Sequence, residues 1–206
     1  MRAATTVRLF VAINLPGDVR RLAHEAAAPL RAAAPHVRWV AEENLHMTLK
    51  FLGRVADADA PAVADALRRA AARHRAAELE LTGFGAFPSL RRPRVVWAGA
   101  VPDPRLELLH HDVEVACEAL GFEVDGRPFR PHVTLGRAKL PGAGDDNRAL
   151  ARAARTAQLH AACTVQSVDL MRSELSPGGA RYTIVAALPL LPSRPSGVPS
   201  RGRLST

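Results

Sequence analysis

The order in which strand-like and helix-like segments follow one another most limits what this chain can fold into. Several strand-like segments follow each other directly, without the helix that a doubly wound parallel sheet needs after every strand. This order indicates an α+β fold with antiparallel sheets. The segments expected as strands from their alternating apolar residues are Val7–Ile13, Val37–Val40, Leu45–Leu52, Glu78–Phe84, Arg94–Ala100, His132–Gly136, Ala161–Met171 and Arg181–Leu188. The segments expected as helices from apolar residues at helical spacing begin near Asp18 and span Asp59–His74, Pro104–Leu120 and Asn147–Ala154.

Chain length and charge indicate the domain organisation. The 206 residues suit one domain or two closely packed lobes. Residues 190–206 are rich in Ser, Pro and Gly and carry three arginines and no acid. We therefore expect residues 1–189 to fold and residues 190–206 to form a disordered basic tail. The formal net charge is +8, and a basic body is compatible with a polyanionic partner such as RNA but does not require one.

Composition argues against several classes of protein. No run of eighteen apolar residues is present, and residues 1–6 hold no long apolar stretch, so we expect neither a membrane span nor a secretory signal. The two cysteines, Cys117 and Cys163, form no Cys-x-x-Cys pair and are too few for a disulfide scaffold. Aromatic residues make up 4% of the chain, which argues against a long platform for stacking single-stranded bases. We expect a cytoplasmic protein.

Two short segments, His46–Leu49 and His132–Leu135, repeat one pattern: histidine, an apolar residue, threonine, leucine. Two such matches among eight histidines are expected by chance in about one chain in a hundred. Both segments lie in strand-like surroundings, where successive side chains alternate between the two faces. The histidine and threonine of each segment therefore share one face, and the two apolar residues point into the core.

Two imidazoles that serve one centre favour general acid–base catalysis. Histidine titrates near neutral pH, so one ring can accept a proton while the other donates one, and each role contributes about 10²–10⁴-fold to a rate. The hydroxyls of Thr48 and Thr134, with a nearby arginine, have the chemistry to hold phosphate oxygens. A metal site is the alternative, with Glu42 and Glu43 as the acids nearest to His46, but no His-x-x-x-His or His-Glu-x-x-His spacing is present. We expect no metal and no other cofactor.

With these motifs and several further stretches, the chain resembles the two-histidine (2H) phosphoesterases. Within them it resembles the bacterial and archaeal RNA 2′,3′-cyclic phosphodiesterases, historically called 2′-5′ RNA ligases. The resemblance covers about Val7 to Leu188, and the segment beyond Pro189 departs from the pattern. It rests on the paired His-x-Thr-x (HxTx) motifs and is supported by Arg8–Ile13, Asn44–Gly53, Phe84–Pro88, Arg94–Trp97, Arg127–Arg137, Ser173–Leu175 and Ala180–Tyr182.

The resemblance implies two similar lobes, each with a small antiparallel sheet and flanking helices, with one motif from each lobe in a shared cleft. It implies metal-free hydrolysis of a 2′,3′-cyclic phosphate at an RNA end, which leaves a 2′-phosphate. His46 would donate a proton to the departing 3′ oxygen, and His132 would accept one from water. Thr48 and Thr134 would hold the phosphate, and Arg137 matches an arginine in the family's cleft. The further candidates for contact with RNA are Arg130, Phe129 and Phe10, the last of which has a packed core position as its other interpretation.

Other functions stay open on the sequence alone. The same two imidazoles would also join RNA ends through 2′-5′ linkages, cleave such linkages or open cyclic nucleotides. A function of a different class is an RNA-binding module without catalysis, whose affinity would not change when both histidines are replaced. In each case the expected partner is RNA, with a 2′,3′-cyclic phosphate end for the hydrolase, and we expect no membrane and no obligate protein partner.

Overall fold

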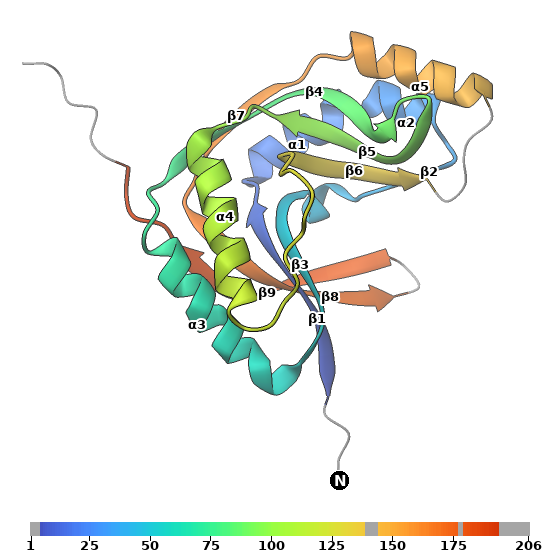
Figure 1. Cartoon of the computed structure of the whole chain (residues 1–206). Coiled ribbons are helices and arrows are strands. Elements are labelled where there is room, and N and C mark those ends of the chain that lie inside the picture. The colour runs from blue at the N-terminus through green and yellow to red at the C-terminus, as the bar shows by residue number, and fades with distance from the viewer. Residues whose placement is uncertain (1–4, 139–143, 177–178, 194–206) are drawn as a thin grey trace, which may run out of the picture.

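A single curled antiparallel sheet of nine strands organises the protein. The computed structural model describes residues 5–138, 144–176 and 179–193. The strands lie in the order β7-β4-β5-β6-β3-β1-β8-β9, and β2 pairs with the outer part of β6 (Figure 1). Together with five α-helices in the described part, this sheet confirms the predicted α+β class. The strands are β1 (Thr6–Asn14), β2 (Val37–Trp39), β3 (His46–Ala56), β4 (Ala77–Ser89), β5 (Arg92–Ala100), β6 (His132–Ala138), β7 (His160–Val165), β8 (Ser167–Ser176) and β9 (Gly179–Pro189).

The two expected lobes are the two halves of this sheet. One half holds β7, β4, β5, β6 and β2, and the other holds β3, β1, β8 and β9. Among the described residues, the halves are paired with each other at one position only, where Met47 of β3 lies opposite Val133 of β6. Both residues are fully buried, so the junction of the halves is also part of the core.

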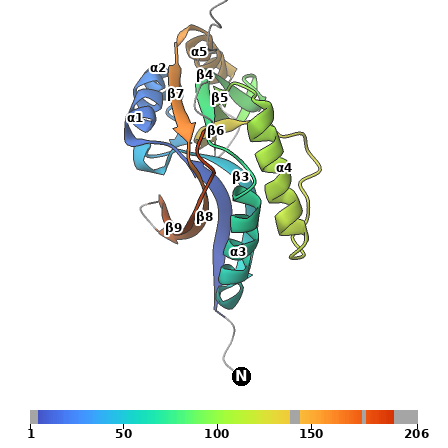
Figure 2. The ribbon, with the colours of Figure 1, turned by 90° about the vertical axis from the view of Figure 1, so that its left-hand side faces the viewer.

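Helices cover one side of each half. Helices α3 and α4 pack against each other beside β3, β8 and β9, whereas α1, α2 and α5 lie against the other half (Figures 1 and 2). The helices are α1 (Gly17–Ala26), α2 (Ala28–Ala33), α3 (Ala60–Ala71), α4 (Pro104–Glu118) and α5 (Gly144–Thr156), and two short 3-10 turns are η1 (Glu42–Asn44) and η2 (Asp57–Asp59).

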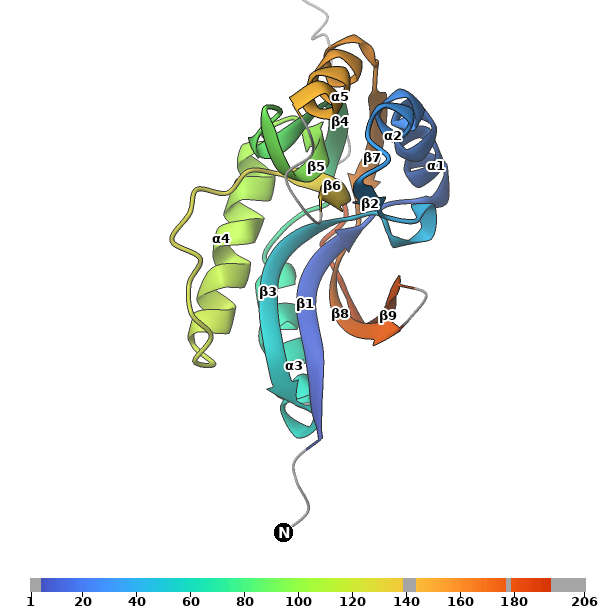
Figure 3. The same ribbon diagram turned by 90° about the vertical axis from the view of Figure 1, so that its right-hand side faces the viewer.

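The alternation of β1 shows which face of the sheet the helices leave open. The odd-numbered residues Val7, Leu9, Val11 and Ile13 are buried in the main core with residues of α3 and α4. The even-numbered residues therefore point the other way, to the side of β1 and β3 that carries no helix in Figure 3. We call this side of the sheet the site face.

The segment 161–171 is two strands, not the one strand that its apolar pattern predicts. β7 ends at Val165 and β8 begins at Ser167. β7 pairs with β4 in one half of the sheet, whereas β8 pairs with β1 in the other. The chain must therefore leave one half and enter the other at Gln166, a change of direction that hydrophobic periodicity does not encode.

The folded body also extends past its predicted end at residue 189. Leu190 is buried, and its N–H donates to the carbonyl of Gln166 at 2.8 Å. Leu191 exchanges backbone hydrogen bonds with the segment after α3: its N–H donates to His74 O, and Ala76 N–H donates to its carbonyl, both at 2.7 Å. The boundary at Leu190 is therefore wrong, and most of the predicted tail, residues 194–206, lies outside the described residues.

Candidate active site

The two motifs meet where the halves of the sheet join. Because Met47 lies opposite Val133, each motif histidine lies across from the threonine of the other motif. The two histidines are thus diagonal neighbours on adjacent antiparallel strands, which places their Cα atoms about 7–8 Å apart. Met47 and Val133 point into the core, so the two histidines and two threonines all lie on the site face.

Each motif imidazole is held by the same kind of hydrogen bond. The Nδ1 of His46 lies 2.7 Å from the carbonyl oxygen of Asn44, and the Nδ1 of His132 lies 2.7 Å from the carbonyl oxygen of Arg130. A carbonyl only accepts, so Nδ1 must carry the proton in both rings. The Nε2 atoms are therefore the ones left to exchange protons with a ligand.

An irregularity after each motif decides which residue next reaches the site face. The pairing of β3 with β1 shifts at residues 49–50, and the pairing of β6 with β5 shifts at residues 135–136. At each shift two successive residues are buried, instead of one buried residue followed by one on the site face. The fifth residue after each histidine then returns to the site face. In β3 this residue is Phe51, and in β6 it is Arg137.

Aromatic rings pack against both imidazoles. His46 lies against Phe10 and Tyr182, with ring centroids 5.0 and 5.2 Å away. His132 meets Phe87 at 5.0 Å with the ring planes nearly perpendicular. These contacts fix the orientation of each imidazole and remove water from its sides.

Burial lowers the pKa of both motif histidines below the ordinary value of 6.5. For each ring the largest cause is desolvation, the backbone hydrogen bond to Asn44 or Arg130 opposes it, and the positive charge of Arg137 adds to the lowering. Arg137 is therefore close enough to act on both rings. Without an anion beside them, both imidazoles are mainly neutral at pH 7.

The predicted phosphate-binding residues lie beside the histidines. Thr48 and Thr134 are half-buried on the site face, and neither hydroxyl has a hydrogen-bond partner among the described residues. Arg137 is exposed and next to Arg38 of β2 in the sheet. Two hydroxyls without partners in the described part and a guanidinium group thus lie on the face that carries the two imidazoles, and these are groups that can bind a tetrahedral oxyanion.

The remaining three candidates are placed differently. The Phe10 side chain is only 3% exposed and supports His46 from the side, so it packs as its core interpretation expects. Phe129 stacks on His110 of α4 at 4.0 Å and packs against the main core, a placement that does not support contact with RNA. The Arg130 side chain is exposed, but the structure gives a defined contact only to its carbonyl, which holds His132.

Comparison with known proteins matches this arrangement to one family. Residues 18–177 match the family model of the 2′-5′ RNA ligase superfamily. A protein of Methanothermobacter thermautotrophicus named RNA 2′,3′-cyclic phosphodiesterase is 32% identical over 177 residues, which cover 86% of this chain and 95% of that protein. The chain belongs to the 2′-5′ RNA ligase superfamily.

Two further relatives show how far the likeness to members of this superfamily extends. A protein of Geobacillus stearothermophilus, also named RNA 2′,3′-cyclic phosphodiesterase, is 34% identical over 88% of this chain, and the chain spans 57% of its length. The crystal structure of Escherichia coli LigT complexed with 3′-AMP superposes with a TM-score of 0.70 at 29% identity, covering 90% of this chain and 99% of LigT. The paired HxTx motifs of this chain thus lie on a fold that E. coli LigT shares.

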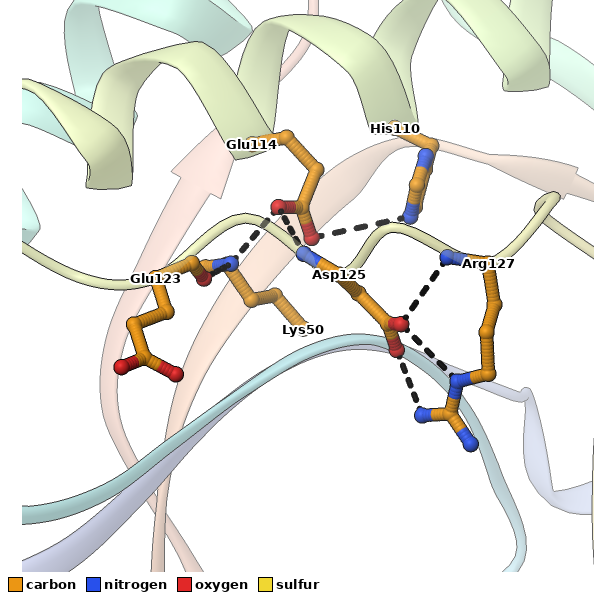
Figure 4. A network of polar contacts seen from close by, with 6 residues as sticks. All are labelled: Lys50, His110, Glu114, Glu123, Asp125 and Arg127. Atoms are coloured by element: carbon orange, nitrogen blue, oxygen red, sulfur yellow. Dashed lines mark hydrogen bonds and ion pairs between the residues drawn. The ribbon is translucent and has the colours of Figure 1, made fainter.

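A buried polar network ties the segment before the second motif to β3 and α4 (Figure 4). The Nζ of Lys50 donates to Glu114 Oε2 at 2.6 Å and to the carbonyl of Glu123 at 2.7 Å, and Asp125 N–H donates to the same Glu114 oxygen at 3.2 Å. The other Glu114 oxygen lies 3.8 Å from His110 Nε2. The network therefore fixes the segment between α4 and β6, which leads to the carbonyl that holds the second motif histidine.

Sequence reasoning missed several residues around the site. Tyr182 and Phe87 contact the motif histidines, Phe51 is 67% exposed on the site face, and Arg38 lies beside Arg137. Tyr182 belongs to a stretch that carried the resemblance, which was the one available signal for it. Positions such as Phe51 depend on where a strand is irregular, and the sequence does not show this.

Two further observations concern acidic and histidine side chains and the length of the helices. Within the described ranges, no group of three or more His, Cys, Asp or Glu side chains is arranged to hold a metal ion. Glu42, which sequence proximity made a candidate ligand, lies 3.8 Å from His24 instead. None of the helices in the described part has the length and apolar character needed to cross a membrane.

Proposed function

We propose that this chain hydrolyses the 2′,3′-cyclic phosphate at an RNA end to a 2′-phosphate, with His46 and His132 as acid and base and without a metal ion. The observation that carries the proposal is the β3–β6 register, which sets both imidazoles on one face, with no hydrogen-bond partner for either Nε2 atom among the described residues. The names of the Methanothermobacter and Geobacillus relatives support the same substrate class.

The proposed step breaks one bond and forms one at phosphorus. Nε2 of His132 accepts a proton from water, whose oxygen bonds to phosphorus. The bond from phosphorus to the 3′ oxygen breaks, and Nε2–H of His46 donates a proton to that oxygen. The products are a 3′ hydroxyl and a 2′-phosphate monoester. The assignment of acid and base between the two rings follows the family resemblance.

The surrounding groups suit the charge that this step develops. The hydroxyls of Thr48 and Thr134 donate to non-bridging oxygens, and the Arg137 guanidinium compensates the negative charge. A bound anionic phosphate also opposes the lowered pKa of the nearby imidazoles, because it favours their protonated form. When substrate binds, His46 therefore takes up from solvent the proton that it later donates as an acid.

The test is hydrolysis of an oligoribonucleotide with a 2′,3′-cyclic phosphate end. We expect the wild-type protein to yield a 2′-phosphate, and we expect His46→Ala and His132→Ala each to lower kcat by about 10²–10⁴-fold. His160→Ala, which removes an exposed histidine of β7, is the matched control and should keep wild-type activity. Near wild-type turnover in either motif variant would refute the mechanism.

Three added measurements distinguish this reaction from a metal-dependent reaction, from 2′-5′ joining and from RNA binding without catalysis. Activity should survive EDTA, and complete loss that a divalent ion restores would contradict the metal-free reaction. Product analysis in the presence of an RNA with a 5′ hydroxyl distinguishes hydrolysis from 2′-5′ joining, in which that hydroxyl replaces water as the nucleophile. RNA binding that is unchanged in the double histidine variant, with no turnover in the wild type, would indicate a binding module. The cytoplasmic location and the absence of an obligate protein partner stay predictions.

A further inference from the structure

Two arginines lie side by side at the far end of the site face. Arg8 of β1 is directly opposite Arg54 of β3, and both side chains are exposed. Like charges directly opposite each other on adjacent strands destabilise a sheet. A negative charge between or beside the two guanidinium groups would offset this repulsion.

Among the described residues, no acidic side chain pairs with either arginine of this pair. In the described part of the chain, the side chains of Arg8 and Arg54 make no ion pair or hydrogen bond. The nearby acids Asp57 and Glu174 are both taken by Arg172, at 3.8 and 3.5 Å. Arg8, Arg54 and Arg172 line a surface pocket of about 260 Å³ together with Glu174, and the Glu174 carboxylate is paired with Arg172 rather than with Arg8 or Arg54.

The arginine pair shares its face with the motif histidines. β1 alternates regularly, so Arg8 points to the same side as Phe10, whose ring contacts His46. Asn14, the residue of β1 opposite His46, lies six residues from Arg8. At 3.2–3.4 Å per residue, the arginine pair is about 20 Å along the strand from His46.

An exposed aromatic ring lies between these two points. Phe51 is opposite Phe10 in the β1–β3 pairing, and their ring centroids are 6.2 Å apart. Phe51 is 67% exposed, although a ring of this size is usually buried. Exposed aromatic rings beside basic side chains are the usual means of holding single-stranded nucleic acid, since every base can stack on them.

We propose that Arg8 and Arg54 form a subsite for a backbone phosphate of single-stranded RNA whose 3′ end lies at His46 and His132, with Phe51 contacting a base between them. The proposal rests on the proposed function for the orientation of the strand. A stacked strand rises about 3.4 Å per nucleotide, so about six nucleotides span the 20 Å. A mononucleotide is too short to reach both sites.

The kinetic test compares two substrates that differ in length: an oligoribonucleotide of eight nucleotides and cytidine, each with a 2′,3′-cyclic phosphate. In Arg8→Gln/Arg54→Gln we expect KM for the octanucleotide to rise about tenfold more than KM for the mononucleotide, with a weaker dependence on salt. Arg21→Gln/Arg69→Gln removes two exposed charges from α1 and α3 and is the matched control. An equal change for both substrates, or an equal change in the control, would overturn the proposal.

A binding test keeps the subsite separable from catalysis. Anisotropy of a fluorescent octanucleotide that already ends in a 2′-phosphate requires no turnover. We expect weaker binding in Arg8→Gln/Arg54→Gln and in Phe51→Ala, each by about tenfold, but not in the control. Arginine-dependent binding without any hydrolysis would overturn the proposed function and leave the subsite standing. Hydrolysis by the wild type, with octanucleotide binding that does not change when the arginines are replaced, would overturn the subsite and leave the proposed function standing. If inorganic phosphate binds at these arginines and the octanucleotide does not displace it, the site takes a free anion and the subsite proposal is wrong.

Discussion

Replacing Lys50 with Met should destabilise the protein more than almost any other single change in the charged residues. Lys50 is 4% exposed and its partner Glu114 is 5% exposed, so the variant leaves a carboxylate inside the core with only the N–H of Asp125 as a hydrogen-bond donor. The carbonyl of Glu123 loses its donor as well. Removing one member of a buried ion pair costs about 3–5 kcal/mol, a large part of the 5–15 kcal/mol that a typical domain has.

Urea denaturation followed by circular dichroism measures this change in the free energy of unfolding. In Lys50→Met/Glu114→Leu neither charge remains, so we expect most of the lost stability to return. Asp65→Asn, in the exposed pair that Asp65 forms with Arg68 on α3, is the control and should change stability by less than about 1 kcal/mol. A loss below about 1 kcal/mol in Lys50→Met, or a double variant less stable than that single variant, would refute the reasoning. If Lys50→Met does not fold, the test is the double variant, which must fold because it leaves no unpaired charge in the core.

Three further predictions concern the pH dependence of activity, the pH dependence of stability, and backbone packing. Both motif histidines have lowered pKa values, so a neutral base and a protonated acid are present together only below the ordinary histidine pKa of 6.5. The bell-shaped pH profile of kcat/KM should therefore peak below pH 6.5. A peak above pH 7.5 would contradict the assignment. The same lowering means that protonation favours the unfolded chain, so the free energy of unfolding should fall as pH drops below 6.5, and the fall should shrink in His46→Ala. At Gly136 an added Cβ would lie 2.6 Å from Val37 Cγ1, so Gly136→Ala should lose about 1–3 kcal/mol by denaturation, whereas Gly126→Ala, where nothing lies within 4 Å, should not.

The site's central pair was predictable because its signal is local and repeated. Each HxTx motif occupies four residues, and strand alternation alone places its histidine and threonine on one face. That the two strands are neighbours follows from the family resemblance rather than from the pattern. Their register depends on one pairing, Met47 with Val133, which no local pattern in the sequence specifies.

The parts that sequence reasoning missed depend on departures from regular alternation. Strict alternation from His46 would place Lys50 on the site face, but the shift at residues 49–50 turns it into the core and brings Phe51 to the surface. The same shift in β6 brings Arg137 beside both imidazoles. Phe129, which the sequence analysis named as a candidate for contact with RNA, stacks its ring on His110 of α4. Nearness along the chain says little about which side of a sheet a residue faces.

The most direct test of the two-imidazole account uses a cyclic phosphate RNA end in which sulfur replaces the 3′ bridging oxygen. A thiolate leaves without needing a proton, so the sulfur substrate should restore most of the activity that His46→Ala loses and little of the activity that His132→Ala loses. Equal responses of the two variants to the substitution would contradict the division of roles between His46 and His132.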